Sequence, residues 1–510
     1  MAKVRHSFGI VIALILLGSG LRAGLLTGAV RFHPDEASYA SFARAFAVRG
    51  DWLLTGNLDK PPLALWGQAV LMATVGVTLD DNGLRQLDLL QGEFTARLWS
   101  FYASVFTLAV GYRLARDTLS PTGGMWTLAG LSLSPLLIVF SATAFTDSPM
   151  ILFGMLAMVM AWRKRPLWAG LCLALAYGNK QQAIVFVPLV VAFLAVRFRG
   201  WDWRAWTRFV LGSGSILILL VIYDGLRPDP SIFALATQHN QPERWLVTWW
   251  ELPTRAVAWW EVARWAAIGL MAMVFPLRLP TVPMRLMRGW LIAYVLLHLL
   301  TDVRIYDRYV LLIEPFLLLT AVAIVHQQSS KHAPLILGGV WVAMLPIAVY
   351  ASTAQLPIGG DRGKHDGIIE LAHYVNEREF GAIVYDRWLG WELNYYLGEW
   401  TDKRRAYYPT PFALLKDPAL LVADVAPRYF PAPSGVAFGA WQQAFESLGF
   451  VVCEGYRQTG FVVYVLLERD QLEDDPRYHE NALKACPALN TPTGSDTLHT
   501  LLQPSDDNNP

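Results

Sequence analysis

Charged side chains are scarce in this chain. Only 16% of its 510 residues are Asp, Glu, Lys or Arg, whereas 54% are hydrophobic. A typical soluble domain carries about a quarter charged residues. The formal net charge is +1, so no excess of either sign favours nucleic acid as a partner. Because the apolar residues fall in long blocks of membrane-spanning length, the composition excludes an ordinary soluble protein and indicates a membrane protein.

Cysteine is also rare, with three in the whole chain. Cys172 lies in an apolar block and is expected to be a buried, inert thiol. Cys453 and Cys486 both lie in the C-terminal region, where two free thiols and a disulfide both stay open. No cysteine spacing resembles a metal or redox motif. No P-loop or Gly-x-Gly-x-x-Gly segment follows a predicted strand either, so nothing supports the use of a nucleotide.

Long apolar blocks fill the first 350 residues or so and predict about eleven transmembrane helices. The first block, Phe8–Val30, lacks the small-residue cleavage site of a signal peptide and is interpreted as a retained helix. The run Leu63–Val77 follows two prolines and is interpreted as an interfacial helix. The other predicted spans are Phe94–Ala115, Gly123–Phe140, Pro149–Trp162, Leu167–Tyr177, Ala183–Val196, Phe209–Tyr223, Val262–Leu277, Gly289–Thr301, Tyr309–Val325 and Leu335–Tyr350.

The charges in the short loops predict the orientation of these helices. If the N-terminus is cytoplasmic, the triplet Arg163-Lys164-Arg165 and the other Arg and Lys clusters share the cytoplasmic side. Acidic residues, including Asp35, Glu36 and Asp147, then fall on the opposite side. The sequence therefore predicts a multi-pass protein of the cell (inner or plasma) membrane with a cytoplasmic N-terminus.

The composition changes after Tyr350, where the last apolar block ends. The alternating runs Phe450–Tyr456 and Phe461–Glu468 predict a β-hairpin. A helix is predicted at Lys364–Phe380, a strand at Gly381–Tyr385 and a helix at Trp441–Leu448. We therefore expect a transmembrane domain at residues 1–352, a small extracytoplasmic α/β domain at 353–486, and a disordered tail at 487–510.

The first outer loop, residues 31–93, holds the adjacent carboxylates Asp35 and Glu36 directly after a predicted span. Beside an apolar wall, one of them could have a raised pKa and act as a base. The competing interpretation is that one of them caps the following helix. The pair could also bind Mg²⁺ or Mn²⁺, and the sequence leaves metal use open.

Lys60 precedes Pro61-Pro62 in the same loop. The prolines bias Lys60 to an extended backbone, so its ammonium group could neutralise a phosphate at the interface. An ordinary lysine that reaches toward the water layer is the competing interpretation.

The order of motifs resembles the protein-mannosyltransferase superfamily. The motifs are Pro34-Asp35-Glu36 with Tyr39-Ala40, Gly50-Asp51-Trp52, Lys60-Pro61-Pro62-Leu63, Glu93-Phe94-Thr95-Ala96-Arg97-Leu98, Phe145-Thr146-Asp147-Ser148-Pro149, and Arg308-Tyr309 followed by Pro315. Each motif is weak alone, but the ordered set is specific. The lysine at position 60 favours the bacterial branch, which resembles the transferases that add aminoarabinose to lipid A.

This resemblance implies the GT-C fold and transfer of a sugar, with inversion, from a polyprenyl-phosphate donor. The acceptor would be a hydroxyl of a protein, lipid A or a glycan. By the same resemblance Asp35 is the base or the acceptor-orienting group, Lys60 meets the donor phosphate, and Asp147 is a second acidic site residue. Fixed cations should stabilise the departing phosphate. The predicted substrate-binding residues are Glu36, Lys60, Arg97, Lys180, Arg304, Arg308 and Tyr309, and the five cations among them are the candidates for the donor phosphate.

Two other functions fit parts of the sequence. A ligase or polymerase of surface polysaccharide would use a similar helical scaffold but a diphosphate-linked donor. A secondary transporter would require charges near the membrane midplane and repeated broken helices. The charges gather at the outer ends of the predicted spans and no repeat is found, so a glycosyltransferase is favoured.

Overall fold

The computed structural model describes residues 2–28, 30–198, 202–242, 244–266, 279–328, 331–357, 359, 363–417 and 427–486. The chain divides into two compact units. The first unit comprises Met1–Ala29 and Phe42–Gly360, and the second comprises Val30–Ser41 and Asp361–Pro510. The tail predicted to be disordered, 487–510, lies outside the described residues.

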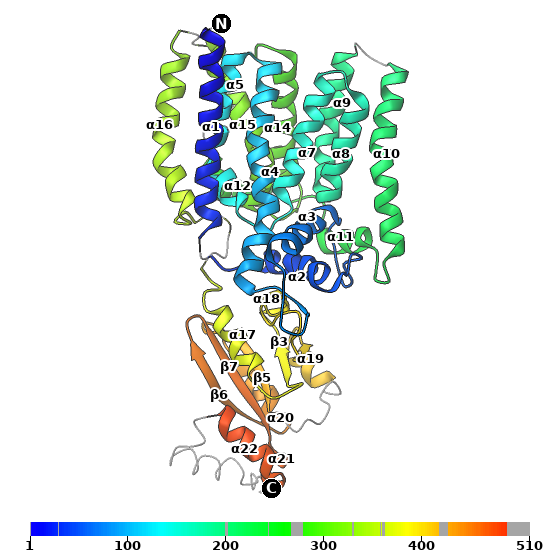
Figure 1. Cartoon of the computed structure of the whole chain (residues 1–510), viewed down its shortest axis with the longest axis vertical. Coiled ribbons are helices and arrows are strands. Elements are labelled where there is room, and N and C mark those ends of the chain that lie inside the picture. Colours follow the sequence, from blue (N-terminus) through cyan, green and yellow to red (C-terminus); the bar gives the residue numbers. More distant parts are fainter. Residues whose placement is uncertain are drawn as a thin grey trace. The chain divides into compact units, whose positions relative to one another are not determined.

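The first unit is a bundle of helices (Figure 1). Its elements are α1 (Ala2–Leu26), α3 (Leu63–Leu71), α4 (Leu89–Thr118), α5 (Pro121–Leu133), α6 (Pro135–Ser141), α7 (Asp147–Trp162), α8 (Pro166–Asn179), η2 (Gln181–Phe186), α9 (Val187–Arg197), α10 (Trp203–Leu226), α11 (Ile232–Asn240), η3 (Trp249–Glu251), α12 (Leu252–Ala263), α14 (Val282–Leu300), α15 (Asp307–Gln328) and α16 (Ala333–Ser352). The helix α2 (Pro34–Arg49) begins in the second unit and ends in the first. Many of these helices fall on the predicted apolar blocks, whereas α11, η3 and most of α12 lie between two predicted spans.

The predicted span Gly123–Phe140 is in fact two helices, α5 and α6, bent by 57°. The break falls at Ser134-Pro135, because a proline has no N–H and disfavours a helical residue before it. The Ser134 hydroxyl accepts a hydrogen bond from the N–H of Leu137 and starts α6. Arg22, fully buried in α1, donates to the carbonyl oxygens of Leu131 and Ser132. These bonds satisfy carbonyls that the break removes from the α5 ladder.

Helices long and apolar enough to cross a membrane are confirmed, but the number of eleven is not. Among the described residues four helices qualify: Phe8–Leu26, Trp203–Leu226, Asp307–Gln327 and Ala333–Ser352. The bent pair α5 and α6 makes a fifth if it is one span. Several other apolar helices are shorter than the roughly 20 residues that cross a bilayer. Most of the predicted span Val262–Leu277 lies outside the described residues.

The predicted interfacial helix corresponds to α3, which continues into the π-helical turn η1 (Met72–Gly76). A short hairpin of β1 (Thr78–Leu79) and β2 (Arg85–Gln86) then leads to α4. Asp88 starts α4, because its carboxylate accepts hydrogen bonds from the N–H groups of Leu90 and Gln91.

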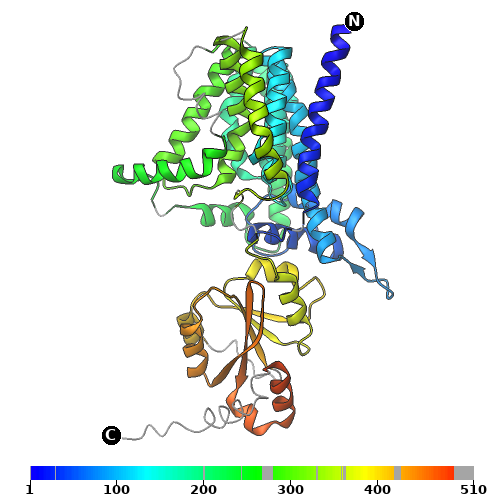
Figure 2. The same cartoon turned by 90° about the vertical axis from the view of Figure 1, so that its left-hand side faces the viewer.

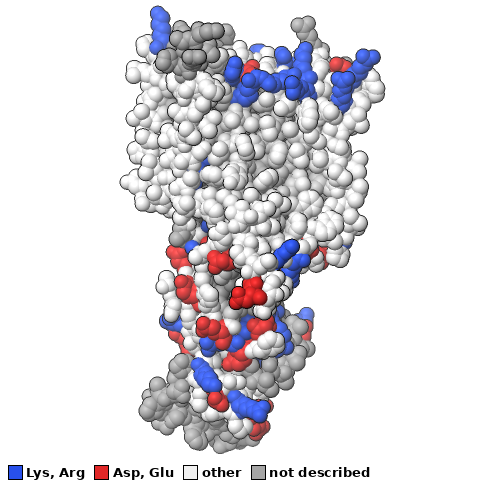
Figure 3. Space-filling view, viewed as in Figure 1, with Lys and Arg blue, Asp and Glu red and all other residues white. Residues whose placement is uncertain are grey.

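Lys and Arg side chains gather over the end of the first unit where α1 begins (Figure 3). At the ends of α4 and α7, the carboxylate of Asp117 binds Arg113 at 3.1 Å and Arg163 at 2.7 Å. A broad uncharged surface follows this rim along the helices in Figure 3. This distribution fits an apolar membrane layer bordered by a basic rim.

The second unit contains a five-stranded mixed sheet in the order β4-β3-β5-β7-β6. Its strands are β3 (Ile383–Asp386), β4 (Arg404–Tyr407), β5 (Arg428–Pro433), β6 (Phe450–Gln458) and β7 (Phe461–Glu468). Its helices are α17 (Ile368–Asn376), α18 (Gly390–Tyr396), α19 (Pro411–Lys416), α20 (Gly439–Ser447), α21 (Arg469–Asp474) and α22 (Pro476–Ala485). The predicted hairpin is β6 and β7, which pair antiparallel. The small α/β domain is therefore confirmed.

Strands β4 and β5 were not predicted, and β5 shows why. It contains Pro431 and Pro433, and proline is normally absent from inner strands. Along its whole length β5 pairs antiparallel with β7, but it pairs with β3 only at Tyr429. Both prolines lie beyond that residue, so their missing N–H groups cost no bond toward β3.

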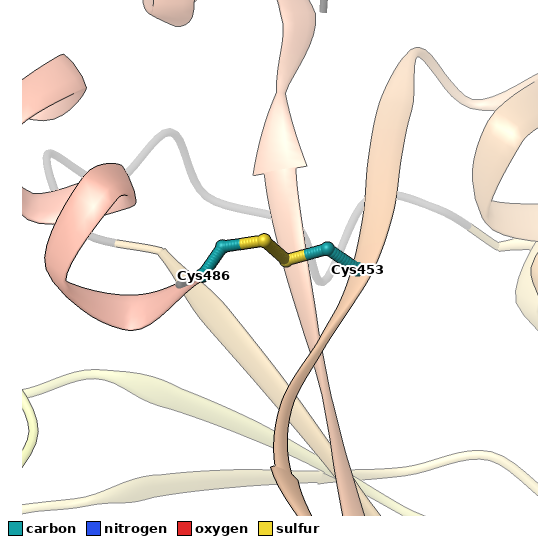
Figure 4. The surroundings of a disulfide bond; sticks show 2 residues. All are labelled: Cys453 and Cys486. Atoms are coloured by element: carbon teal, nitrogen blue, oxygen red, sulfur yellow. A yellow bond between two sulfur atoms is a disulfide. The ribbon is translucent and has the colours of Figure 1, made fainter. Parts of the chain in front are cut away.

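A disulfide joins Cys453 in β6 to Cys486, which directly follows α22 (Figure 4). The two Cα atoms are 6.2 Å apart. Of the two alternatives that the sequence left open, the structure therefore has the disulfide. Cys172 is a free, buried thiol, as predicted. The bond ties α22 to the edge strand of the sheet.

Removing this disulfide should destabilise the second unit. The linked residues are 33 apart in the sequence. Closing a loop of that size lowers the entropy of the unfolded chain, which raises the free energy of unfolding by about 3–4 kcal/mol at 25 °C. Cys453→Ser should therefore speed amide hydrogen exchange in β6 and β7 of the intact protein by two orders of magnitude or more. Cys172→Ala, which removes a thiol of the first unit, is the control. Unchanged exchange in Cys453→Ser would show that the bond does not stabilise the unit.

Candidate active site

A polar cavity of about 780 Å³ lies in the first unit. The ends of α8 and α11, the turn η2 and the loop before α15 form its walls. It is lined by Lys60, Tyr177, Lys180, Gln181, Gln182, Ile184, Phe233, Ala236, Thr237, His239, Asn240, Gln241, Pro242, Asp302, Val303, Arg304, Tyr306 and Tyr309. Of the predicted substrate-binding residues, Lys60, Lys180, Arg304 and Tyr309 therefore share one cavity.

Lys60 enters the cavity from the loop before α3. Its Nζ lies 2.6 Å from Oδ2 of Asp59, so the ammonium group already has an anionic partner. The backbone oxygen of Asp59 accepts a hydrogen bond of 2.8 Å from Nε2 of Gln181. Pro62 follows as the residue before α3. The loop is thus held from both sides, which limits the freedom of the Lys60 side chain.

Lys180 and Asp147 form a buried ion pair at the wall of this cavity. Lys180 is the first residue after α8, and Asp147 lies in the first turn of α7. The distance from Nζ to Oδ1 is 2.7 Å, and the side chains are 6% and 2% exposed. The other oxygen of Asp147, Oδ2, has no hydrogen-bond partner among the described residues. A carboxylate at a helix N-terminus is stabilised by the helix dipole.

The pKa of the Lys180 ammonium is lowered to about 8, mainly by burial and also by the nearby charges of Arg308 and Lys60. Asp147 opposes these effects through its charge and its hydrogen bond. A buried cation with several cationic neighbours is costly for the protein. An anionic ligand in the cavity would relieve that cost, so this region is suited to bind a phosphate.

The other predicted cations lie in different places. The guanidinium of Arg308 lies 4.7 Å from the ring centre of Phe145, which directly precedes the Thr146-Asp147 turn. Arg97 is buried in α4 and is not among the described residues that line the polar cavity. The structure thus places Arg308 near Lys180 and does not bring Arg97 to the cavity wall.

Asp35 and Glu36 belong to the second unit, at the start of α2. Oε2 of Glu36 accepts a 3.0 Å hydrogen bond from the N–H of His33, and the N–H of Asp35 donates to Nδ1 of His33 at 3.1 Å. His33 and Glu36 therefore cap this helix in a reciprocal manner. Asp35 contributes its backbone N–H to this cap, and the role of its carboxylate as a base stays a prediction.

Asp35 and Glu36 were also the candidate ligands for Mg²⁺ or Mn²⁺. Within the part of the chain that the structure describes, no group of three or more His, Cys, Asp and Glu side chains is placed to hold a metal ion. Two adjacent carboxylates alone would leave most of an octahedral shell to water and substrate.

The structure adds Arg227, which the sequence analysis did not single out. Arg227 follows α10, is fully buried, and donates to the backbone oxygens of Leu53, Leu54 and Gly56 at 2.6–3.1 Å. Oδ2 of Asp229 accepts the N–H of Gly56 at 2.7 Å. This clamp fixes the loop that leads to Lys60. Its partners are about 170 residues away, so no local pattern could have revealed it.

Replacing Arg227 with methionine should release this loop. Three buried or half-buried carbonyl groups would lose a charged donor, which costs about 3–5 kcal/mol together. We expect Arg227→Met to increase hydrogen exchange at residues 53–58 at least tenfold and to weaken phosphate binding through Lys60. Arg208→Met is the matched control, since Arg208 is exposed near the other end of α10. Slow exchange in both variants would contradict the clamp.

His239 is a second residue that the sequence did not reveal. It lies in the last turn of α11, lines the cavity, and places Nδ1 3.4 Å from Oδ2 of Asp59. The Asp59 carboxylate thus lies between a histidine and a lysine. Only the fold brings position 239 to position 59.

An apolar cavity of about 530 Å³ adjoins the polar one. Its lining residues are Leu173, Ala174, Tyr177, Ala183, Ile184, Val187, Phe209, Ser213, Leu217, Leu220, Val221 and Phe233. Three of them, Tyr177, Ile184 and Phe233, line the polar cavity as well. The two spaces together suit a ligand with an anionic head and an apolar tail.

The fold is that of the GT-C glycosyltransferases. ArnT from Cupriavidus metallidurans in the apo state matches with a TM-score of 0.58 and 16% identity over 91% of this chain and 98% of that one. ArnT bound to undecaprenyl phosphate matches over the same shares with a TM-score of 0.54 and 15% identity. The apo oligosaccharyltransferase from Archaeoglobus fulgidus has a TM-score of 0.52 and 10% identity over 90% of this chain and 74% of that one.

By sequence, residues 59–223 match the family described as dolichyl-phosphate-mannose-protein mannosyltransferase. This segment includes Lys60, Asp147 and Lys180 but not Asp35. No curated protein matches the chain. The resemblance recognised from the motifs is confirmed. Membrane glycosyltransferases are the class of this family and of these structures, which is the class of enzyme that the motifs predicted.

Proposed function

We propose that this protein transfers a sugar from a polyprenyl-phosphate donor to an acceptor hydroxyl on the extracytoplasmic face of the cell membrane, with inversion at the anomeric carbon. The observation that supports it most directly is the pair of adjoining cavities, one lined by Lys60, Lys180 and Arg304 and the other apolar. A lipid phosphate is amphiphilic in the same way. The ArnT of similar fold has been solved with undecaprenyl phosphate bound.

In this proposal the apolar cavity holds the first part of the polyprenyl chain, between α8, η2, α10 and α11. Tyr177, Ile184 and Phe233 mark the junction where the phosphate would enter the polar cavity. Lys60, Lys180 and Arg304 then face the phosphate oxygens, with Tyr309 and Arg308 beside them. Because negative charge grows on this phosphate as the sugar leaves, cations held in place lower the barrier.

Asp35 is the proposed base that removes the proton of the acceptor hydroxyl, with Glu36 beside it. Asp147 holds Lys180 toward the cavity through the 2.7 Å ion pair. The oxygen of the acceptor forms the new bond to the anomeric carbon while the bond from that carbon to the phosphate oxygen breaks. The products are the glycosylated acceptor, the free polyprenyl phosphate and one proton. Acceptors of three kinds, protein, lipid A and glycan, are compatible with this chemistry.

Two features support an extracytoplasmic second unit and a cytoplasmic N-terminus. The disulfide between Cys453 and Cys486 forms in an oxidising compartment. The basic rim at the end of the first unit where α1 begins fits the cytoplasmic side. We propose a multi-pass arrangement in the inner or plasma membrane on these grounds.

Donor binding can be tested with undecaprenyl phosphate as the probe, in nanodiscs, by native mass spectrometry. We expect retention of undecaprenyl phosphate but not of undecaprenol, and at least tenfold weaker retention by Lys60→Met. Lys331→Met is the control, because Lys331 is exposed in the turn after α15. The cavity lies at the other end of α15, where Tyr309 lines it. Since α15 has 22 residues, Lys331 is roughly 33 Å from the cavity. Equal retention of both lipids would overturn the proposed donor.

Transfer itself requires a sugar-labelled membrane lipid and total envelope acceptors. The labelled sugar should move to an acceptor in the presence of the wild-type chain and should not move with Asp35→Asn. Impermeant thiol labelling of single cysteines at positions 35 and 57, where Asn57 is exposed, should modify both from the extracytoplasmic side of intact cells. Labelling from the cytoplasmic side only would rule out the proposed location.

A further inference from the structure

A concentration of exposed aromatic side chains lies outside both cavities, in residues 245–260. Trp249 is 77% exposed and Trp245 is 68% exposed. The exposed large apolar side chains of this segment, which we call the tryptophan platform, are Trp245, Leu246, Trp249, Trp250, Val257 and Trp260. Single exposed apolar residues are normal, but six in one short segment mark an interaction surface.

The helix α12 presents two different apolar faces. Trp259 and Ala263 are buried on the face that packs against α14 and α15. Val257 and Trp260, three residues apart and therefore neighbours on the helix surface, are exposed on another face. Glu261, also exposed, borders this second face. The described part of the first unit thus leaves one apolar stripe of α12 uncovered.

The orientation of α12 differs from that of the long helices. Figure 2 shows α12, in green, lying across the axes of the bundle rather than along them. A helix with this direction, an apolar stripe and a polar edge is typical of one that lies in the plane of a membrane surface. Tryptophan is enriched at that depth because its ring is apolar and its N–H is polar.

The platform is attached to the end of α14. Leu246 and Thr301 form a β-bridge, and the N–H of Val247 donates to the oxygen of Leu300 at 3.1 Å. The N–H of Asp302 donates to the oxygen of Trp245 at 3.2 Å. Arg255 of α12 donates to the backbone oxygens of His298 and Val303 at 2.7 and 2.6 Å. The height of the platform along the bundle is therefore set by residues 298–303.

Those residues mark the edge of an apolar surface. Ile292, Leu296, Leu297 and Leu300 are exposed along α14. The helix ends at Leu300, and the next residues are the polar Thr301 and the charged Asp302. An exposed apolar helix surface in a membrane protein faces lipid, so the boundary between acyl chains and water lies at about residues 300–302 on this side. Trp245, whose backbone oxygen accepts the N–H of Asp302, lies at the same height.

We propose that the tryptophan platform is a membrane-surface anchor, inserted among the lipid headgroups of the leaflet next to the polar cavity. The anchor is continuous with the lipid-facing surface of α14, so a bilayer surface is the partner that fits it. Asp302 and Val303, which bind the platform, also line the cavity, and Arg304 follows them in its wall. The anchor therefore holds this rim of the cavity at the depth of the headgroups.

The depth of nitroxide labels tests this proposal without any enzyme substrate. In a Cys172→Ala background, single labels at Val257→Cys and Trp260→Cys would be measured in nanodiscs of phosphatidylethanolamine and phosphatidylglycerol. The Val257 variant keeps every tryptophan, so it remains informative if the Trp260 variant folds poorly. We expect collision rates with oxygen to exceed those with a water-soluble nickel chelate by fivefold or more. The label at Glu261→Cys is the control and should favour the nickel chelate.

Two results would overturn the anchor. In the first, the labels at positions 257 and 260 are as accessible to the nickel chelate as the label at position 261. In the second, spin–spin broadening in proteoliposomes disappears on dilution with unlabelled protein, which would identify a second copy as the partner. Neither result depends on undecaprenyl phosphate, so the anchor and the proposed donor can fail separately.

Discussion

Replacing Lys180 with methionine is expected to lower kcat/KM for sugar transfer by about 100- to 1000-fold. That is the loss observed when an enzyme loses one fixed donor to a developing negative charge. Lys180 has the same role in the proposed site, because it lies at the cavity wall with its ammonium group 2.7 Å from Asp147. Initial rates with labelled membrane donor, over a range of donor concentrations, measure the effect.

The variant has a second consequence, for stability. Removing Lys180 leaves the carboxylate of Asp147 buried without its partner, which destabilises a protein by about 3–5 kcal/mol. The double variant Lys180→Met with Asp147→Asn removes both charges and should recover most of the melting temperature. It should not recover the rate. A double variant with wild-type transfer would show that this ion pair has only a structural role.

The rate of transfer should also fall as the pH rises through about 8. Burial is the main reason that the pKa of Lys180 is lowered to about 8, with further lowering by Arg308 and Lys60. Below that pH the side chain is a cation and can bind the donor phosphate, and above it the cation is lost. We expect kcat/KM to be flat below pH 7 and to fall tenfold per unit above 8, so about 100-fold by pH 10.

Lys180→Arg separates this titration from other causes. Arginine stays charged throughout the range, since its pKa exceeds 12 in water. Whatever the starting rate of this variant, its fall should move to higher pH by at least one unit. If wild type and Lys180→Arg fall at the same pH, another group controls the profile, and Lys180 is not the cation that binds the donor.

The local properties of the chain were readable from its residues. Apolar blocks indicated where helices run, because the length and spacing of apolar residues along the chain predict a helix before its packing partners are known. The hairpin β6–β7 was equally clear, since each strand alternates and the turn residues lie between them. The break within residues 123–140 was missed even though Pro135 is visible in the sequence. A proline in a long apolar block is compatible with both a kinked and a broken helix.

The sequence identified some residues of the candidate site and missed others. Lys60, Lys180, Arg304 and Tyr309 stood out as polar residues beside apolar blocks, and the fold places them around one cavity. Arg97 stood out in the same way but is not among the described lining residues. His239 and Asp59 meet only because α11 returns to the first loop. A charged residue at the end of an apolar block shows its height in the membrane, not its direction around the helix.

The sequence by itself determined that this is a helical membrane protein with a small α/β unit, and its ordered motifs indicated the class of enzyme. These properties depend on composition and on residues near one another in the chain. Only the tertiary structure decided which side chains share a cavity, which cysteine alternative holds, and which residues clamp the first loop. The contacts involved join positions 33 to about 180 residues apart. Their free energy exists only once distant helices and strands have packed, so no local pattern encodes them.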